Sequence, residues 1–202
     1  VPMAADESPR RIQLMVEQSV MRLCITNERL NGVECISVEQ ALADDSDDYQ
    51  PVLVNPQSPV YINFSSGTSG EPKGIECLQQ GIIRLVEQPD YVNLNPQTRM
   101  MCAAPATFDA FTLEFWGPLL NGGQVCFMTQ PQMDIAGLRH LIQHQGVNTA
   151  WLTAALFHTL VDLDATAFAG LEQLLVGGDV VSPEHVRRVY QAVANIQIIN
   201  GY

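Results

Sequence analysis

Lysine is almost absent from this sequence, and positive charge is scarce overall. The 202 residues include one lysine, Lys73, nine arginines and 22 acidic residues, so the formal net charge is −12. A protein whose main role is to bind nucleic acid needs a concentrated basic face for the phosphate backbone. The composition therefore argues against a nucleic-acid partner.

Paired cysteines and membrane-length apolar runs are also missing. The five cysteines form no C-x-x-C pair, which argues against a disulfide framework or zinc ribbon and favours a reduced, cytoplasmic setting. The uncharged run from Gly146 to Val161 contains several polar side chains, so it is too short and too polar to cross a membrane. No signal peptide is recognisable, and we expect both ends of the chain to be cuts within a longer protein.

The sequence offers no convincing metal site. His140 and His144 are spaced one helical turn apart, but no third ligand is evident and the H-E-x-x-H pattern is absent. We interpret the two histidines as part of the solvent face of a helix.

Strands and helices are expected to alternate from residue 60 onward. The patterning predicts strands at 60–64, 100–104, 124–128, 148–152, 173–177 and 196–200, and helices at 76–87, 109–120, 135–145, 154–162 and 183–193. Such alternation predicts an α/β fold of βαβ units with a mostly parallel sheet flanked by helices. Residues 1–59 form a leading segment, with a helix after Ser8-Pro9 and strands at 22–26 and 34–38, and residues 60–202 form the βαβ region.

A loop rich in glycine and hydroxyl side chains follows the strand at 60–64. It reads Ser-Ser-Gly-Thr-Ser-Gly-Glu-Pro-Lys-Gly over residues 65–74. Backbone N–H groups, hydroxyls and one cation in such a loop can bind phosphate oxygens. The loop matches neither a Walker A motif nor a G-x-S-x-G nucleophile elbow, and its composition alone equally fits a flexible surface loop.

Three motifs in order resemble the adenylation domains of nonribosomal peptide synthetases. Residues 65–74 resemble the phosphate-binding signature of adenylate-forming enzymes, T-S-G-[ST]-T-G-x-P-K-G. Phe108-Asp109-Ala110 with Glu114 and residues 119–123 resemble F-D-A-x-x-x-E…L-L-x-G-[GA], and residues 200–202 resemble the start of N-x-Y-G-P-T-E. Together these motifs cover nearly the whole chain.

The resemblance implies how ATP is bound. The phosphate-binding residues would be Ser65, Ser66, Gly67, Thr68, Ser69, Gly70 and Lys73. The adenine-binding residues would be Gly177, Gly178, Asp179, Asn200, Gly201 and Tyr202. For the two glycines at 177 and 178, a tight turn between strand and helix is the alternative interpretation.

The resemblance also implies an amino-acid pocket. Asp109 would pair with the α-ammonium group, although it could equally be an ordinary N-cap. The side-chain pocket would be lined by Ala110, Leu113, Trp151, Leu175, Gly177 and Gly201. Because this wall is apolar, we expect valine or a similar branched aliphatic substrate, while a plain core role remains the alternative for Trp151 and Leu175.

The implied reaction converts ATP and an amino acid, with Mg²⁺, to aminoacyl-AMP and pyrophosphate. The aminoacyl group would then load the phosphopantetheine thiol of a carrier (thiolation) domain, next to a condensation domain of the same assembly line. No catalytic residue is expected within the chain, since the family's magnesium glutamate, ribose aspartate and catalytic lysine would lie beyond Tyr202. The chain alone would therefore be inactive. The alternatives are an acyl- or aryl-CoA ligase fragment and a silent nucleotide-binding or scaffold subdomain.

Overall fold

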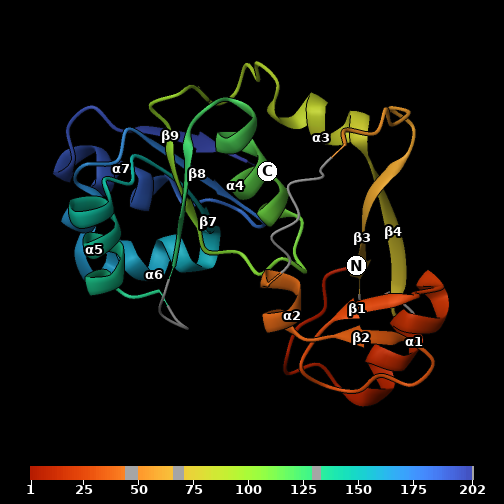
Figure 1. Cartoon of the computed structure of the whole chain (residues 1–202). Coiled ribbons are helices and arrows are strands. Elements are labelled where there is room, and N and C mark those ends of the chain that lie inside the picture. Colours follow the sequence, from red (N-terminus) through yellow and green to blue (C-terminus); the bar gives the residue numbers. More distant parts are fainter. Residues whose placement is uncertain (44–49, 66–70, 129–132, 202) are drawn as a thin grey trace. The chain divides into compact units, whose positions relative to one another are not determined.

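The computed structural model describes residues 1–43, 50–65, 71–128 and 133–201, and Figure 1 shows their helices and strands. The chain divides into two compact units, Val1–Gly81 and Ile82–Tyr202, and each is described by itself.

The first unit begins as expected. Helix α1 (Pro9–Ser19) starts after Ser8, whose hydroxyl accepts a hydrogen bond from the backbone N–H of Arg11 at 3.3 Å. Strands β1 (Leu23–Ile25) and β2 (Glu34–Ile36) then pair in parallel. The second strand ends before Val38, where we predicted it to end, because Ser37 and Gln40 form a capping box that begins helix α2 (Val38–Leu42).

The helix predicted at 76–87 is wrong in its first three residues, 76–78, which belong to a strand. Strands β3 (Pro59–Ser65) and β4 (Lys73–Leu78) form an antiparallel hairpin, and helix α3 (Gln79–Val86) begins only after it. Gly74 lies so close to the side chains of Ile62 and Phe64 that an added Cβ would approach them to 3.1 and 3.3 Å. Cross-strand packing therefore overrides the local preference of this segment for helix.

The second unit contains the predicted parallel sheet. Its strands are β5 (Arg99–Cys102), β6 (Gln124–Phe127), β7 (Thr149–Thr153), β8 (Gln173–Gly177) and β9 (Gln197–Asn200), all parallel, in the order β6-β5-β7-β8-β9. The connecting helices are α4 (Ala110–Leu120), α5 (Ile135–Gln145), α6 (Ala154–Asp164), the 3₁₀ turn η1 (Ala165–Phe168) and α7 (Pro183–Ala192). The α/β prediction is confirmed for this unit.

The two faces of this sheet are covered by different helices (Figure 1). On one face, alternate residues such as Leu152 and Val176 join a buried core with Leu138 of α5, Phe157 of α6 and Val189 of α7. Helix α4 packs against β5, β6 and β7. Trp151 and Leu175 point to the face opposite Leu152 and Val176, because successive side chains of a strand alternate.

Two helix starts in this unit were predicted from capping residues. Asp134 accepts a hydrogen bond from the N–H of Gly137 at 2.7 Å and caps α5 as expected. The Ser182 side chain does not cap α7; instead its backbone N–H donates to Nε2 of His158 on α6 at 3.0 Å. Within the described parts of the chain, every helix is too short or too polar to cross a membrane.

Candidate substrate and nucleotide site

The strand order of the second unit marks where a ligand is expected. After β5 the chain moves to β6 on one side of it, and then returns to β7 on the other side. In open parallel sheets, ligands bind beyond the carboxyl ends of the strands at such a reversal. The connection after β5, which carries Asp109, leaves the sheet at this reversal, and Trp151 lies at the middle of β7, the strand on the other side of β5.

Asp109 occupies the N-cap position of α4 with an exposed side chain. Its Oδ1 accepts a hydrogen bond from the N–H of Ala110 at 2.8 Å. No other hydrogen bond or ion pair to this carboxylate occurs among the residues that the structure describes. Asp109 therefore stands at the cap position, but it bonds to the first helical N–H and not to the second or third as an ordinary N-cap does, and its carboxylate keeps capacity for a cationic partner.

The apolar residues of the implied pocket come from β7, from β8 and from the residue after β9. Trp151 and Leu175 are neighbours in the β7–β8 register, and an added Cβ on Gly201 would lie 3.7 Å from Nε1 of Trp151. An added Cβ on Gly177 would lie only 2.8 Å from the carbonyl oxygen of Gly201, so this position has no room for a side chain. The four residues are thus neighbours, with Gly177 and Gly201 at the carboxyl ends of the strands and Trp151 and Leu175 in mid-strand.

Helix α4 contributes the other two residues of this set. Ala110 is its first residue, and Leu113 is 8% exposed. Leu113 and Leu175 are both buried, yet neither belongs to the large core that α5, α6 and α7 share. Protein atoms on the opposite face, where α4 packs, therefore cover both side chains, which agrees with the plain core role that we considered for Leu175.

The residues expected to bind adenine lie at the ends of β8 and β9. Gly178 has a φ of +80°, which favours glycine, and Asp179 is exposed and accepts a hydrogen bond from the N–H of Val180 at 2.7 Å. Asn200 pairs with Val176 in the sheet register, and Gly201 donates its N–H to the carbonyl of Val176 at 2.8 Å. Tyr202 lies outside the described residues.

The loop predicted to bind phosphate belongs to the first unit. Ser65 ends β3 and Lys73 begins β4, and the two are paired across the hairpin, both exposed. The hairpin therefore brings the two ends of the loop together. The other predicted phosphate-binding residues, 66–70, lie outside the described residues.

Glu114 is the residue of this region whose importance the sequence did not reveal. It is fully buried on α4, and its Oε2 accepts hydrogen bonds from the N–H groups of Ala103 and Ala104, both at 2.8 Å. Burial raises the pKa of Glu114 to about 7, although these two bonds and an interaction with the Cys102 thiol oppose the shift. Only the resemblance to F-D-A-x-x-x-E singled out this glutamate, and it gave no role.

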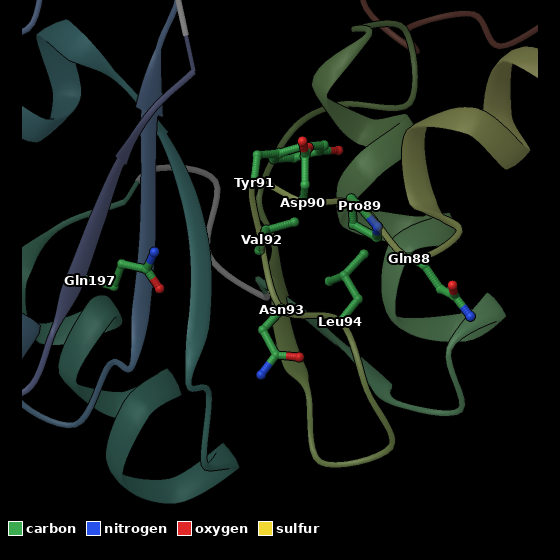
Figure 2. Close-up of a pocket in the computed structure, with 8 residues that line it drawn as sticks. All are labelled: Gln88, Pro89, Asp90, Tyr91, Val92, Asn93, Leu94 and Gln197. Atoms are coloured by element: carbon green, nitrogen blue, oxygen red, sulfur yellow. The ribbon is translucent and has the colours of Figure 1, made fainter.

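A separate cavity of about 430 Å³ lies at the opposite edge of the sheet. Figure 2 shows its lining, which consists of residues 88–94 and Gln197. Gln197 is the first residue of β9, and Asn93 donates its N–H to Oε1 of Gln173, the first residue of β8, at 2.7 Å. This cavity is therefore at the amino ends of the strands and is not the site predicted from the sequence.

His140 and His144, which we interpreted as a solvent face and not as a metal site, lie on α5. Their ring centroids are 4.8 Å apart. Within the described ranges, no group of three or more His, Cys, Asp and Glu side chains could hold a metal ion.

Comparison with known proteins assigns the chain to a family. The sequence model of a protein family described as AMP-binding enzyme matches residues 1–202. The chain belongs to the AMP-binding enzyme family. The resemblance to adenylate-forming enzymes that the motifs predicted is thereby confirmed.

Curated relatives of this AMP-binding enzyme are components of peptide synthetases. One component of the plipastatin synthase of Bacillus subtilis (strain 168) is 33% identical, and one component of the linear gramicidin synthase of Brevibacillus parabrevis is 34% identical, each over 100% of the chain. The chain spans only 8% of the plipastatin protein and 4% of the gramicidin protein.

Solved structures agree with this assignment. Holo-PA1221, described as an NRPS protein containing adenylation and PCP domains, is 37% identical with a TM-score of 0.88; the match covers 99% of this chain and 35% of that chain. The Klebsiella oxytoca NpsA N-terminal subdomain has a TM-score of 0.88 over 99% of this chain and 52% of that chain, and at 22% identity it supports the fold alone.

Proposed function

We propose that this chain is the part of an amino-acid adenylation domain that binds the amino acid and much of the ATP. The complete protein would convert ATP and an amino acid to aminoacyl-AMP and pyrophosphate, then load a phosphopantetheine thiol of a carrier domain, alongside a condensation domain. The observation that carries the proposal is the exposed Asp109 carboxylate at the strand-order reversal, in the same unit as the apolar wall of Trp151, Leu175, Gly177 and Gly201.

Asp109 would hold the amino acid by its α-ammonium group. The carboxylate begins a helix whose apolar residues face the sheet, so a cation there gains a charge-assisted hydrogen bond. The substrate carboxylate would then be free to approach the α-phosphorus of ATP. A substrate without the amino group would leave Asp109 unpaired.

The apolar wall would select an aliphatic side chain. Trp151 would supply a broad flat surface, with Leu175 as its neighbour in the β7–β8 register, and the close approach of Gly177 to the carbonyl oxygen of Gly201 keeps side chains out of that position. No polar group of this set could reward a polar side chain. Valine or a similar branched aliphatic amino acid is therefore the proposed substrate.

ATP fits the residues that the structure describes. Gly177 and Gly178 leave the ends of β8 and β9 without side chains where the base would lie, and Asn200 adds a polar group at the same edge. Ser65 and Lys73 would contact the phosphates from the two ends of the hairpin loop. Mg²⁺ would be bound together with the nucleotide phosphates, which it screens during the displacement.

The test is amino-acid-dependent exchange of pyrophosphate into ATP by a complete adenylation domain that contains this chain. We expect exchange with valine or a similar aliphatic amino acid and little with polar ones. Activity with an aryl or fatty acid, and none with amino acids, would favour the acyl- or aryl-CoA ligase alternative. A domain that binds ATP but exchanges nothing would favour the silent subdomain.

Lys73 gives a second test of the same proposal. Its side chain is exposed at the start of β4, so Lys73→Ala should leave the melting temperature unchanged. Loss of a cation that stabilises charge on the transferring phosphates should lower the exchange rate on the order of 100-fold. Glu76→Ala, at an exposed position of the same strand, is the control and should keep the parental rate.

A further inference from the structure

The carboxyl group of Glu114 is buried at a position where an apolar side chain would cost less free energy to bury. Its side chain is 0% exposed, and Oε1 has no hydrogen-bond partner among the described residues. Burying a carboxylate costs free energy unless its oxygens are well bonded, and unsatisfied buried oxygens are rare in native proteins. The position therefore needs an explanation beyond filling space.

Glu114 bonds to backbone groups that the sheet leaves unpaired. Strand β5 ends at Cys102, so the N–H groups of Ala103 and Ala104 lie just beyond its ladder. Both donate to Oε2 of Glu114 at 2.8 Å. A single carboxyl oxygen can accept two such bonds because it has two lone pairs.

These bonds join the two ends of the chain segment 103–114, which contains Asp109. The chain runs from Ala103 through a turn, in which Phe108 donates its N–H to the carbonyl of Pro105 at 2.9 Å, into α4. Asp109 lies five residues before Glu114 and six residues after Ala103. Since Glu114 ties α4 back to the end of β5, it limits where the start of the helix, and Asp109 with it, can lie relative to the sheet.

We propose that Glu114 is a positioning residue for amino-acid binding: by holding the N–H groups of Ala103 and Ala104, it presents Asp109 to the α-ammonium group at the carboxyl edge of the sheet. This inference rests on the proposed function. It assigns Glu114 no contact with substrate. Its effect should therefore appear in the recognition of the amino group more than in the chemical step.

The experiment compares Glu114→Ala, Glu114→Gln and Leu138→Ala in a complete adenylation domain, each with the substrate amino acid and with its des-amino analogue. Leu138 is fully buried on α5 in the core on the other face of the sheet, so it controls for lost stability alone. Glutamine keeps an acceptor of the same reach for the two N–H groups. Melting temperature, KM and kcat are measured for every variant.

Glu114→Ala should raise KM for the amino acid about tenfold or more, with a smaller change in kcat and no matching rise for the analogue, because the ammonium partner is displaced. Glu114→Gln should stay within about threefold of the parent at pH 8 because it keeps both bonds. Leu138→Ala should melt at a lower temperature and leave both KM values unchanged.

Two results would overturn the inference. One is a folded Glu114→Ala variant that behaves like Leu138→Ala, and the other is a Glu114→Gln variant as impaired as the alanine variant. If the alanine variant does not fold, Glu114→Asp replaces it, since the shorter side chain does not reach both N–H groups, and the same outcomes apply. Absence of exchange in the parent would instead refute the proposed function.

Discussion

Asp109 combines a structural and a proposed functional role in one side chain. It caps α4 through the N–H of Ala110, and its exposed carboxylate remains available for a cation. Because asparagine caps a helix about as well as aspartate, the two roles can be separated by one substitution.

Asp109→Asn in a complete domain should weaken the use of the amino acid by roughly 1.5–3 kcal/mol, the value of a charge-assisted hydrogen bond. The des-amino analogue should be affected much less. The quantity to measure is the ratio of kcat/KM for the two substrates in parent and variant. An unchanged ratio would leave Asp109 as a cap alone.

The buried carboxyl group of Glu114 should make stability depend on pH. Burial raises its pKa in the folded protein from 4.5 to about 7, so the folded state binds the proton more tightly than the unfolded state. Its contribution to the free energy of unfolding is complete below pH 4.5 and is lost as the pH rises through 7. The neighbouring Cys102 thiol stays neutral over this range, since burial and Glu114 raise its pKa to about 12.

Glu114→Gln should abolish this dependence. The difference in unfolding free energy between parent and variant should shift by on the order of 3 kcal/mol between about pH 4.5 and about pH 7.5, in favour of the variant at the higher pH. Urea denaturation at several pH values measures it, and all other titrating groups cancel in the difference. Parallel curves for the two proteins would show that Glu114 titrates normally.

At the residue scale, the motifs predict Asp109 and the apolar wall as site residues, and these stay predictions; the motifs assign Glu114 no role. The signal for Asp109 is local, because it lies in the spacing of one short motif. The importance of Glu114 depends on its burial and on the backbone of Ala103 and Ala104, eleven and ten residues earlier in the chain. One sequence without the fold does not show such a pairing.

Among the elements, the ends of β8 and β9 approach each other very closely. An added Cβ on Gly177 would meet the carbonyl oxygen of Gly201 at 2.8 Å, closer than side-chain carbons approach a backbone oxygen. A side chain at this position must therefore push the two strand ends apart, together with the residues proposed to bind adenine.

Gly177→Ala should destabilise the protein by about 1–3 kcal/mol and weaken ATP binding. Gly81→Ala is the control: Gly81 lies within helix α3 with nothing within 4 Å of its added Cβ, so alanine should stabilise the helix by about 0.5–1 kcal/mol. Thermal unfolding with and without ATP measures both effects. If the two variants unfold alike with and without ATP, the close approach of Gly177 to Gly201 is contradicted.

Predictions of elements succeeded where local signals agreed with the tertiary environment. The sheet strands of the second unit and the caps of α1 and α5 were found because periodicity and capping residues are local. Residues 76–78 were assigned to helix because the antiparallel partner that makes them a strand lies across the loop. The Ser182 side chain does not cap α7, and nothing in the structure explains why.

At the scale of the whole chain, its length relative to its relatives determines what it can do alone. The match to the 37% identical NRPS protein covers 35% of that chain, and the resemblance places the ribose aspartate and the catalytic lysine outside these 202 residues. We expect the purified 202-residue chain to show no amino-acid-dependent pyrophosphate exchange. Detectable exchange above a Lys73→Ala control would contradict this.

The arrangement of the second unit's sheet bears on how its specificity can evolve. Trp151 and Leu175 belong to the proposed pocket, whereas their sequence neighbours Leu152 and Val176 belong to the core formed with α5, α6 and α7. Substitutions on one face leave the packing of the other largely intact, so their effects on stability and on substrate choice are nearly independent. With the proposed pocket, mutation would change which amino acid is accepted, one wall residue at a time, while natural selection keeps the protein folded.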